Sequence, residues 1–132
     1  MKAISTRTTK GIQTGTVLKC IDNTGAKVLE VIAVKGFKGV RGTHPCAGVG
    51  DVIVCAVKKG TQKIKHEVVR ALIVRQAMPY KRPTGTWIKF QDNAAVLLDE
   101  KNEPRGKEIK DVIAKEAVER FRTVGKIART IV

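Results

Sequence analysis

The hydrophobic positions of this 132-residue chain fall in short runs whose apolar residues are mostly β-branched. Val and Ile together number 29 against 5 Leu, a bias that suits the pleated, half-buried surface of a sheet better than a helix. Gly, Pro, Asn or Asp residues bound each run, as they commonly bound strands. The pattern therefore predicts strands at 15–21, 26–35, 52–58, 67–75, 86–90 and 94–98.

Two features of these runs indicate how the strands are arranged. The sequence Asp22-Asn23-Thr24-Gly25 is typical of a tight turn, so the strands on either side of it should form a hairpin. The run 52–57 is apolar at both odd and even positions, so part of the sheet must be covered on both faces or closed on itself. Because closure removes exposed strand edges, we expect a mainly β protein built on a small closed barrel.

Two segments interrupt the strand pattern. Segment 36–50 contains five glycines and has no acidic residue before Asp51. It is predicted to be a mobile, basic loop that approaches phosphates with backbone N–H groups and cationic side chains. Segment 78–85 contains Pro79 and Pro83, which exclude a central strand, so we expect it to project from the body.

The last third of the chain has a different character. A polar turn at 99–106 precedes a stretch with helical spacing at 114–131, where Val118, Phe121 and Val124 would share one face. Gly125 is expected to divide this stretch into two short helices. The length suits a single domain of residues 1–132, with a barrel body at 1–98 and a C-terminal turn and helical region at 99–132.

The charge of the chain is large and unevenly distributed. There are 26 Lys and Arg against 12 Asp and Glu, a net charge of +14. Residues 1–91 hold 17 cations and 4 acids, a net +13, whereas residues 92–132 hold 9 and 8, a net +1. Such an excess repels itself unless a polyanion neutralises it, and nucleic acid is the leading candidate. General solubility would instead interleave both signs, so the two parts should face different partners.

The cations best placed to contact phosphates lie in three predicted loop regions. Aromatic residues are few, which disfavours sequence-specific reading of single strands by base stacking and favours phosphate and shape recognition. The candidate RNA-binding residues are Lys35, Lys38 and Arg41 in the glycine loop, Lys58, Lys59, Lys63 and Lys65 around a hairpin turn, and Arg75, Lys81, Arg82 and Lys89 about the proline segment.

Little in the sequence supports chemistry at a metal or cofactor. His44, Cys46 and His66 lack the paired spacings of a zinc site, and no phosphate-binding glycine motif is present. The few carboxylates in residues 1–91 fall at turns or strand edges. We therefore expect no metal, no cofactor, no small-molecule substrate and no enzymatic activity.

The cysteines and the chain start suggest a cytoplasmic protein. No apolar run is long enough to span a bilayer, and the first residues lack the apolar stretch of a signal peptide. The three cysteines form no Cys-x-x-Cys pair, which fits reduced thiols. Cys20 and Cys55 lie in apolar runs and should belong to the core, so Cys46 is the candidate reactive thiol.

Several segments together resemble the universal L-fourteen family of large-subunit ribosomal proteins, and the likeness runs from about Gly15 to the C-terminus. The matching segments are 22–27 (DNTGAK), 47–51 (AGVGD), 71–75 (ALIVR), and Gly85 with Phe90, Asn93, Val96 and Leu97 at the family's spacing. The extension before Gly15, with 74–76 and 90–93, is more similar to the archaeal and eukaryotic forms. Thr84 and the segment 111–116 depart from the family pattern, which leaves the backbone path at 111–113 open.

The resemblance implies a five-stranded barrel with an added β-ribbon and a short helical C-terminal region, bound to large-subunit rRNA. It also implies a place at the subunit interface, with a bridge to small-subunit rRNA. Neighbouring ribosomal proteins and an anti-association initiation factor would dock on the C-terminal region. The candidate residues for these protein contacts are Lys115, Glu116, Glu119, Arg122 and Lys126. The alternative is a free-standing RNA chaperone or an accessory protein of RNA modification.

Overall fold

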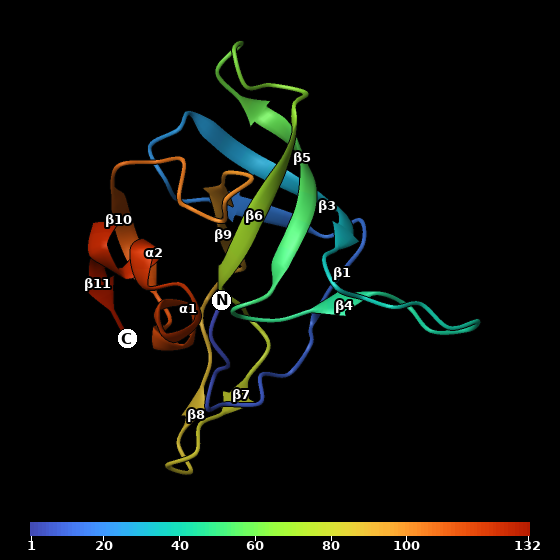
Figure 1. The fold of residues 1–132 in the computed structure, drawn as a ribbon, viewed down its shortest axis with the longest axis vertical. Coiled ribbons are helices and arrows are strands. Elements are labelled where there is room, and N and C mark those ends of the chain that lie inside the picture. Colours follow the sequence, from blue (N-terminus) through green and yellow to red (C-terminus); the bar gives the residue numbers. More distant parts are fainter.

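The computed structural model describes residues 1–132, and a closed barrel of five strands forms its centre (Figure 1). Its strands are β2 (Val17–Cys20), β3 (Ala26–Val34), β5 (Val52–Gly60), β6 (Val68–Arg75) and β9 (Ala94–Leu98). Neighbours pair antiparallel, except that β2 closes the barrel against β9 in parallel. The prediction of a mainly β fold with a small closed barrel is confirmed.

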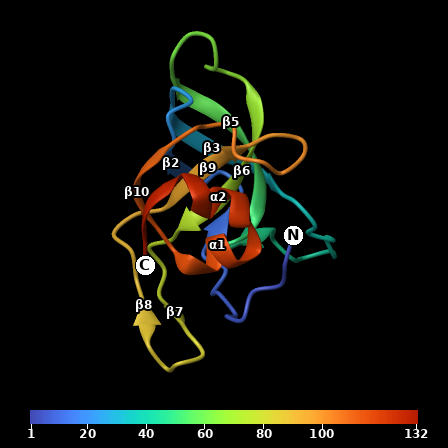
Figure 2. The same ribbon diagram turned by 60° about the vertical axis from the view of Figure 1, so that its left-hand side comes forward.

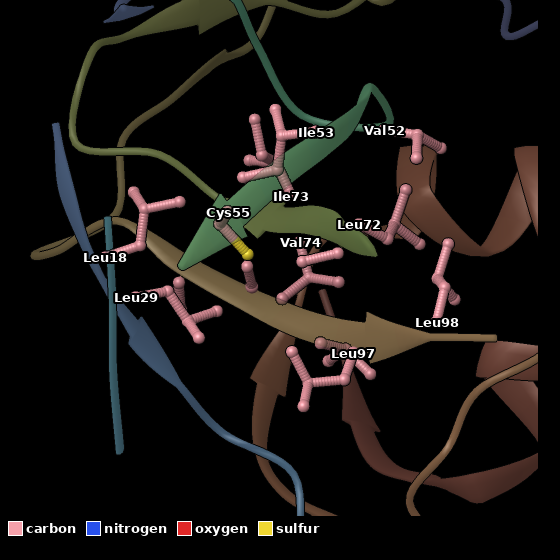
Figure 3. Close-up of a cluster of buried hydrophobic side chains, with 14 of the residues drawn as sticks. Leu18, Leu29, Val52, Ile53, Cys55, Leu72, Ile73, Val74, Leu97 and Leu98 are labelled. Carbon is pink, nitrogen blue, oxygen red and sulfur yellow. The ribbon is translucent and has the colours of Figure 1, made fainter. Parts of the chain in front are cut away.

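The barrel core explains why some strands are apolar at every position. Buried hydrophobic residues form one cluster of 29 members, and all five residues of β9 belong to it (Figure 3). Residues 71–75 of β6 are also buried at both parities, because helix α1 (Lys115–Arg120) packs outside that strand. The cluster continues from the barrel to Ala117, Phe121 and Val124 of the C-terminal region.

The tight turn at residues 22–25 holds the barrel closed as well as joining β2 to β3. The carboxylate of Asp22 accepts hydrogen bonds from the backbone N–H of Thr24 (3.2 Å) and of Leu97 in β9 (2.8 Å). Asn23 Oδ1 accepts one from the N–H of Lys107 at 2.9 Å. The predicted hairpin is confirmed, and its two polar side chains connect it to distant parts of the chain.

Three segments extend from the barrel in different directions (Figure 1). The loop 61–67 joins β5 to β6 at the top of the view, and the loop 35–45 leaves β3 toward β4 (Cys46–Ala47) at the right. At the bottom, β7 (Tyr80–Lys81) and β8 (Trp87–Ile88) form an antiparallel ribbon. The predicted strand 86–90 is thus only two residues long, and it pairs with the proline segment instead of joining the barrel.

The proline segment folds as a ribbon because its prolines stand outside the strand pairing. Pro79 precedes β7 and Pro83 lies in the turn, where Gly85 N–H donates to Arg82 O and Arg82 N–H donates to Thr86 O, both at 2.9 Å. Gly85 has a φ of 88°, which only glycine adopts without strain. A three-residue hairpin loop with a left-handed glycine is a common solution for such a connection.

The C-terminal region corrects the helical prediction for 114–131. Helix α1 ends before Phe121, α2 spans Arg122–Ile127, and the last residues form β11 (Ala128–Ile131), which pairs in parallel with β10 (Ile109–Ile113). The break falls at Phe121, whose ring is buried and whose φ of −126° leaves the helical region. Gly125 lies inside α2 and does not divide the helices.

Gly125 is present for packing instead. A Cβ atom at this position would lie 2.5 Å from Cγ1 of Val118, so glycine lets α2 approach α1 closely. The shared apolar face is confirmed for Phe121 and Val124, which are buried, whereas Val118 is half-buried. Segment 111–113, whose path the sequence left open, is the end of strand β10. Figure 2 shows both helices in front of the barrel.

Candidate nucleic-acid interface

Most of the predicted RNA-binding cations lie on the three projections and face solvent. Eight of the eleven are exposed and take part in no ion pair within the chain. These eight, termed the free cations, are Lys35, Lys38, Arg41, Lys59, Lys63, Lys65, Lys81 and Lys89. Because the three projections point away from one another (Figure 1), the free cations do not form a single patch. A polyanion in contact with all of them would have to surround the barrel.

The glycine loop has an exposed outer part and a buried base. Residues 38–44 are exposed, whereas residues 47–50 are buried. Gly36 and Gly42 have φ values of 81° and 82°, in the left-handed region that glycine adopts without strain and where the backbone can turn sharply. No other residue packs against these two positions. The structure thus confines the predicted phosphate-binding loop to its outer part.

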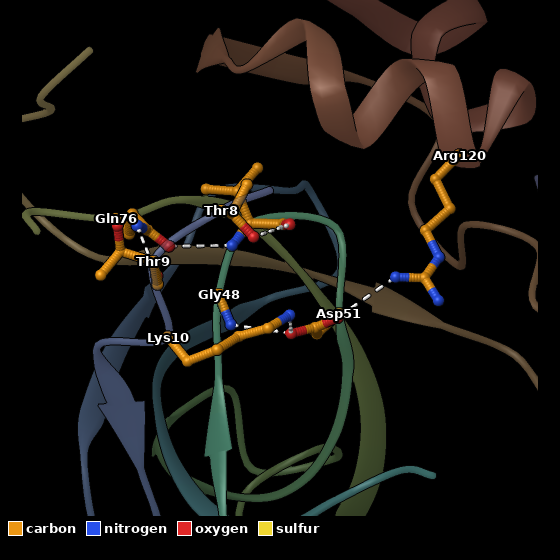
Figure 4. Close-up of polar contacts among 8 residues, drawn as sticks. Thr8, Thr9, Lys10, Gly48, Asp51, Gln76 and Arg120 are labelled. Atoms are coloured by element: carbon orange, nitrogen blue, oxygen red, sulfur yellow. Dashed lines mark hydrogen bonds and ion pairs between the residues drawn. The ribbon is translucent and has the colours of Figure 1, made fainter. Parts of the chain in front are cut away.

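The N-terminal segment fixes the base of this loop (Figure 4). The buried amide of Gln76 accepts from Val49 N–H (2.9 Å) and donates to the carbonyl oxygens of Thr9 (2.9 Å) and Met78 (3.0 Å). β1 (Ile12–Gln13) then pairs with β4. The loop therefore projects from a rigid base.

Asp51 completes the base of the glycine loop (Figure 4). Its carboxylate accepts from Gly48 N–H at 2.9 Å and pairs with Lys10 and, at 3.2 Å, with Arg120. The first acid after the loop thus pairs with two cations from distant segments of the chain. The outer cations Lys38 and Arg41 take part in no ion pair.

The hairpin end between β5 and β6 presents its lysines from a well-packed turn. Ile64 is buried in the hydrophobic cluster and its N–H donates to Thr61 O at 3.1 Å. Lys59, Lys63 and Lys65 stand exposed around it. Lys58 differs, because its ammonium pairs with Glu30 at 2.8 Å on the neighbouring strand. Both groups are partly exposed, so this pair remains open to competition by phosphate.

Arg75 is buried and serves the fold, which corrects its prediction as an accessible RNA contact. Its side chain is 8% exposed and its guanidinium pairs with Asp92 and Asp111, each at 3.0 Å. The hydrogen bond from Arg75 is the main reason that the pKa of Asp111 lies below its usual range. The arrangement ties β6 to the start of β9 and to β10, and burial leaves very little of the Arg75 side chain accessible to phosphate.

The structure also largely buries Arg82, which was predicted to contact RNA, and Glu116, which was predicted to contact a partner protein. Arg82 Nε donates to Glu116 Oε1 at 2.8 Å and its Nη2 donates to the carbonyl oxygen of Val132 at 2.7 Å. Glu116 is fully buried, and Tyr80 Oη donates to its Oε2 at 2.8 Å. Burial and the hydrogen bond to Glu116 raise the pKa of the Tyr80 phenol. Glu116 therefore cannot meet a partner protein from the surface; it joins the ribbon to α1.

The other predicted protein-contact residues remain accessible in part. Lys115, Glu119 and Arg122 line a shallow hollow between the N-terminal segment and the helices, together with Val118 and Ile131. Glu119 accepts a hydrogen bond from Ser5 Oγ at 3.3 Å across this hollow. Lys126 is exposed in the last turn of α2, outside the hollow. Mixed charge around exposed apolar atoms is typical of a protein interface.

The sequence model of the family described as ribosomal protein L14p/L23e matches residues 11–132. The chain belongs to this family. Similar proteins include the large ribosomal subunit protein uL14 of Halorubrum lacusprofundi and that of Haloarcula marismortui, both 46% identical to the chain over 132 residues. The same protein of Picrophilus torridus is 48% identical over 132 residues. In each comparison the alignment covers all of both proteins, and the predicted likeness to archaeal forms is confirmed.

Membership in the L14p/L23e family makes the chain a structural protein of the ribosome and not an enzyme. Neither of its helices has the length and apolar character needed to cross a membrane. Cys55 is buried, and burial raises its pKa to about 12, while Cys20 is half-buried with its pKa also raised, chiefly by burial.

One exposed aromatic residue was missed by the sequence reasoning. Trp87 is the single tryptophan of the chain and is 65% exposed on the ribbon. Adjacent residues of a strand point to opposite faces, so a strand that turns Ile88 inward must turn Trp87 toward solvent. This alternation was the signal for an exposed tryptophan. It stands beside Lys81, its cross-strand partner.

Proposed function

We propose that the chain is a structural constituent of the large ribosomal subunit in the cytoplasm and binds large-subunit rRNA through its free cations. The observation that carries this proposal is the set of eight exposed cations without acidic partners, placed on projections from a rigid barrel. Family membership and the similarity to large ribosomal subunit proteins uL14 support the same assignment.

The mechanism is architectural. Lys and Arg neutralise closely packed phosphates and so lower the repulsion that opposes compact RNA folding. The barrel holds the glycine loop, the hairpin end and the ribbon in fixed directions, so each projection meets a different segment of RNA. The protein would thereby hold those segments at set positions. No chemical step is needed.

The C-terminal region would meet proteins. The hollow at Lys115, Glu119 and Arg122 offers both charge signs beside apolar side chains, which suits neighbouring ribosomal proteins or the anti-association initiation factor. The nearly neutral charge of residues 92–132 supports this division. We also propose that the chain lies at the subunit interface and contributes a bridge to small-subunit rRNA, an idea that rests on the family resemblance.

Charge reversal on the projections provides the test. The variant K38E/K63E/K81E changes one exposed, unpaired lysine on each projection, and the control variant K101E/K107E/K110E makes the same change of net charge in the C-terminal region. Each variant is made with a tag in cells and sedimented through a high-salt gradient, and its affinity for purified large-subunit rRNA is measured against salt concentration. We expect the first variant to leave the large subunit and to lower the salt slope by about 3, roughly one per lost phosphate contact.

The outcomes separate the proposal from its alternative. Recovery of the wild-type protein at one copy per large subunit, with loss of only the projection variant, supports the ribosomal assignment. Recovery of the wild type in light fractions at high salt favours the free-standing RNA chaperone or modification accessory. If both triple variants bind rRNA equally well, the free cations are not the interface.

A further inference from the structure

We propose that Trp87 is a stacking platform for an unpaired RNA base, held in place by the ribbon. This inference rests on the proposed function, since it names a specific rRNA contact within it. It differs from phosphate neutralisation because an indole ring stacks on the face of a base, whereas a cation attracts the charge of a phosphate.

The exposure of Trp87 is unusual within this chain. Of the other aromatic residues, Tyr80 and Phe121 are buried and Phe37 and Phe90 are half-buried. Trp87 alone leaves most of its surface, 65%, in water. An indole normally contributes a large apolar area to folding, so the fold gains little from a tryptophan here and a contact outside the chain accounts for it better.

The ribbon has two faces, and Trp87 lies on the outer one. Tyr80 pairs with Ile88 and Lys81 pairs with Trp87 in the antiparallel register. Side chains that are directly opposite share a face of a two-stranded ribbon. Tyr80 is buried against Glu116, so its face is the inner one, and Lys81 stands beside Trp87 on the outer face.

The ribbon is also held rigidly enough to present a ring in one position. Its turn is closed by two backbone hydrogen bonds of 2.9 Å. The strand β7 is anchored to α1 by Tyr80 and Arg82, which both bind the buried carboxylate of Glu116. Both ribbon views show this element extending away from the barrel (Figures 1 and 2). A preorganised aromatic group loses little conformational freedom on binding.

The charge around Trp87 favours RNA over a protein partner. No acidic residue occurs between Gln76 and Gln91, whereas Lys81, the cross-strand partner of Trp87, and Lys89, two residues further along the chain, are both exposed. An aromatic face flanked by free cations matches a base with its adjoining phosphates, the combination that single-stranded binding surfaces use. A protein partner would instead need unpaired acids opposite these lysines.

The single tryptophan makes the test direct. Intrinsic fluorescence of the full chain is followed during titration with purified large-subunit rRNA, and affinity is measured for W87F, which keeps an aromatic face, and for W87L, which keeps only apolar bulk. Val17→Ala is the control, because Val17 is 59% exposed on a barrel strand. We expect quenched emission, a loss of affinity of about 5- to 100-fold for W87L, a smaller loss for W87F and none for V17A.

Salt dependence separates stacking from charge. W87L should keep the wild-type salt slope, whereas Lys81→Gln should lower it by about 1. Binding of rRNA with unchanged emission, or equal affinity for the Leu and Phe variants, would overturn the stacking proposal and leave the rRNA assignment standing. An emission change seen only with large-subunit proteins, and not with rRNA alone, would also overturn it. Failure of the wild type to bind rRNA would instead overturn the proposed function.

Discussion

The buried ion pair between Arg82 and Glu116 yields a sharp prediction about stability. Replacing Arg82 by Met removes the donors at 2.8 Å and 3.3 Å from a carboxylate that is fully buried. Tyr80 then remains its single side-chain donor. Removing one partner of a buried pair usually costs about 3–5 kcal/mol, because the other charge is left uncompensated.

That cost is large for a domain of this size. The total free energy of unfolding of a small protein is about 5–15 kcal/mol, so R82M should lose a substantial fraction of it. The corresponding decrease in melting temperature is about 10–20 °C. The matched control is Lys81→Met, because the neighbouring Lys81 is exposed and unpaired; a surface change of this kind stays within about 0.5 kcal/mol.

The assay is urea unfolding followed by far-ultraviolet circular dichroism for wild type, R82M, Glu116→Gln and the double variant. The amide of Gln still accepts from Tyr80, so the double variant removes both charges and keeps that hydrogen bond. We expect it to lose less stability than the two single variants summed, since no charge stays buried alone. Additive losses, or an R82M variant as stable as K81M, would refute the assignment of this pair as a buried structural contact.

Three further predictions follow from the packing. Gln76→Ala should cost about 2–4 kcal/mol, because several backbone groups lose their buried partner, and limited proteolysis should then cut the N-terminal segment first. Gly125→Ala should destabilise the protein by about 1–3 kcal/mol through its clash with Val118, although helix propensity alone predicts a gain in stability of about 1 kcal/mol. Thermal unfolding shows which effect is larger, and adding V118A to the variant should restore its stability. A thiol reagent at pH 8 should label Cys46 before Cys55, because Cys55 is buried. The free energy of unfolding should also fall as the pH rises from 9 toward 12. In this range the buried Cys55 thiol, with a pKa of about 12, stays protonated, whereas the thiol of the unfolded chain ionises near 9.

The local sequence pattern was sufficient for the barrel. The turn at residues 22–25 depends only on neighbours in sequence. The apolar residues at both parities in 52–57 reflect burial of a whole strand on both faces. Both features can therefore be predicted from the sequence. Glycine and proline positions likewise placed the loops and showed that segment 78–85 projects, since the conformations that these residues allow are set by the local backbone. The ribbon itself was expected from the family resemblance.

The boundaries of the C-terminal elements could not be predicted in this way. The helical spacing of 114–131 was correct over α1 and α2, but β11 depends on pairing with β10 (Ile109–Ile113), nearly twenty residues earlier. Helix propensity suggested Gly125 as the break, whereas burial of Phe121 and the close approach of Gly125 to Val118 determined the outcome. Tertiary contacts overrode local propensity here, as they do in many short helices.

By itself, the sequence determined that this protein is a basic β-barrel with cationic loops and a nearly neutral C-terminal region, because composition and hydrophobic parity are properties of the chain. The tertiary structure alone decided which charges are free. Arg75 meets Asp111 and Arg82 meets Glu116 across more than thirty residues of sequence, and no local pattern encodes such a meeting. Ion pairs form wherever folding brings opposite charges together, so only the folded chain shows which cations remain for RNA.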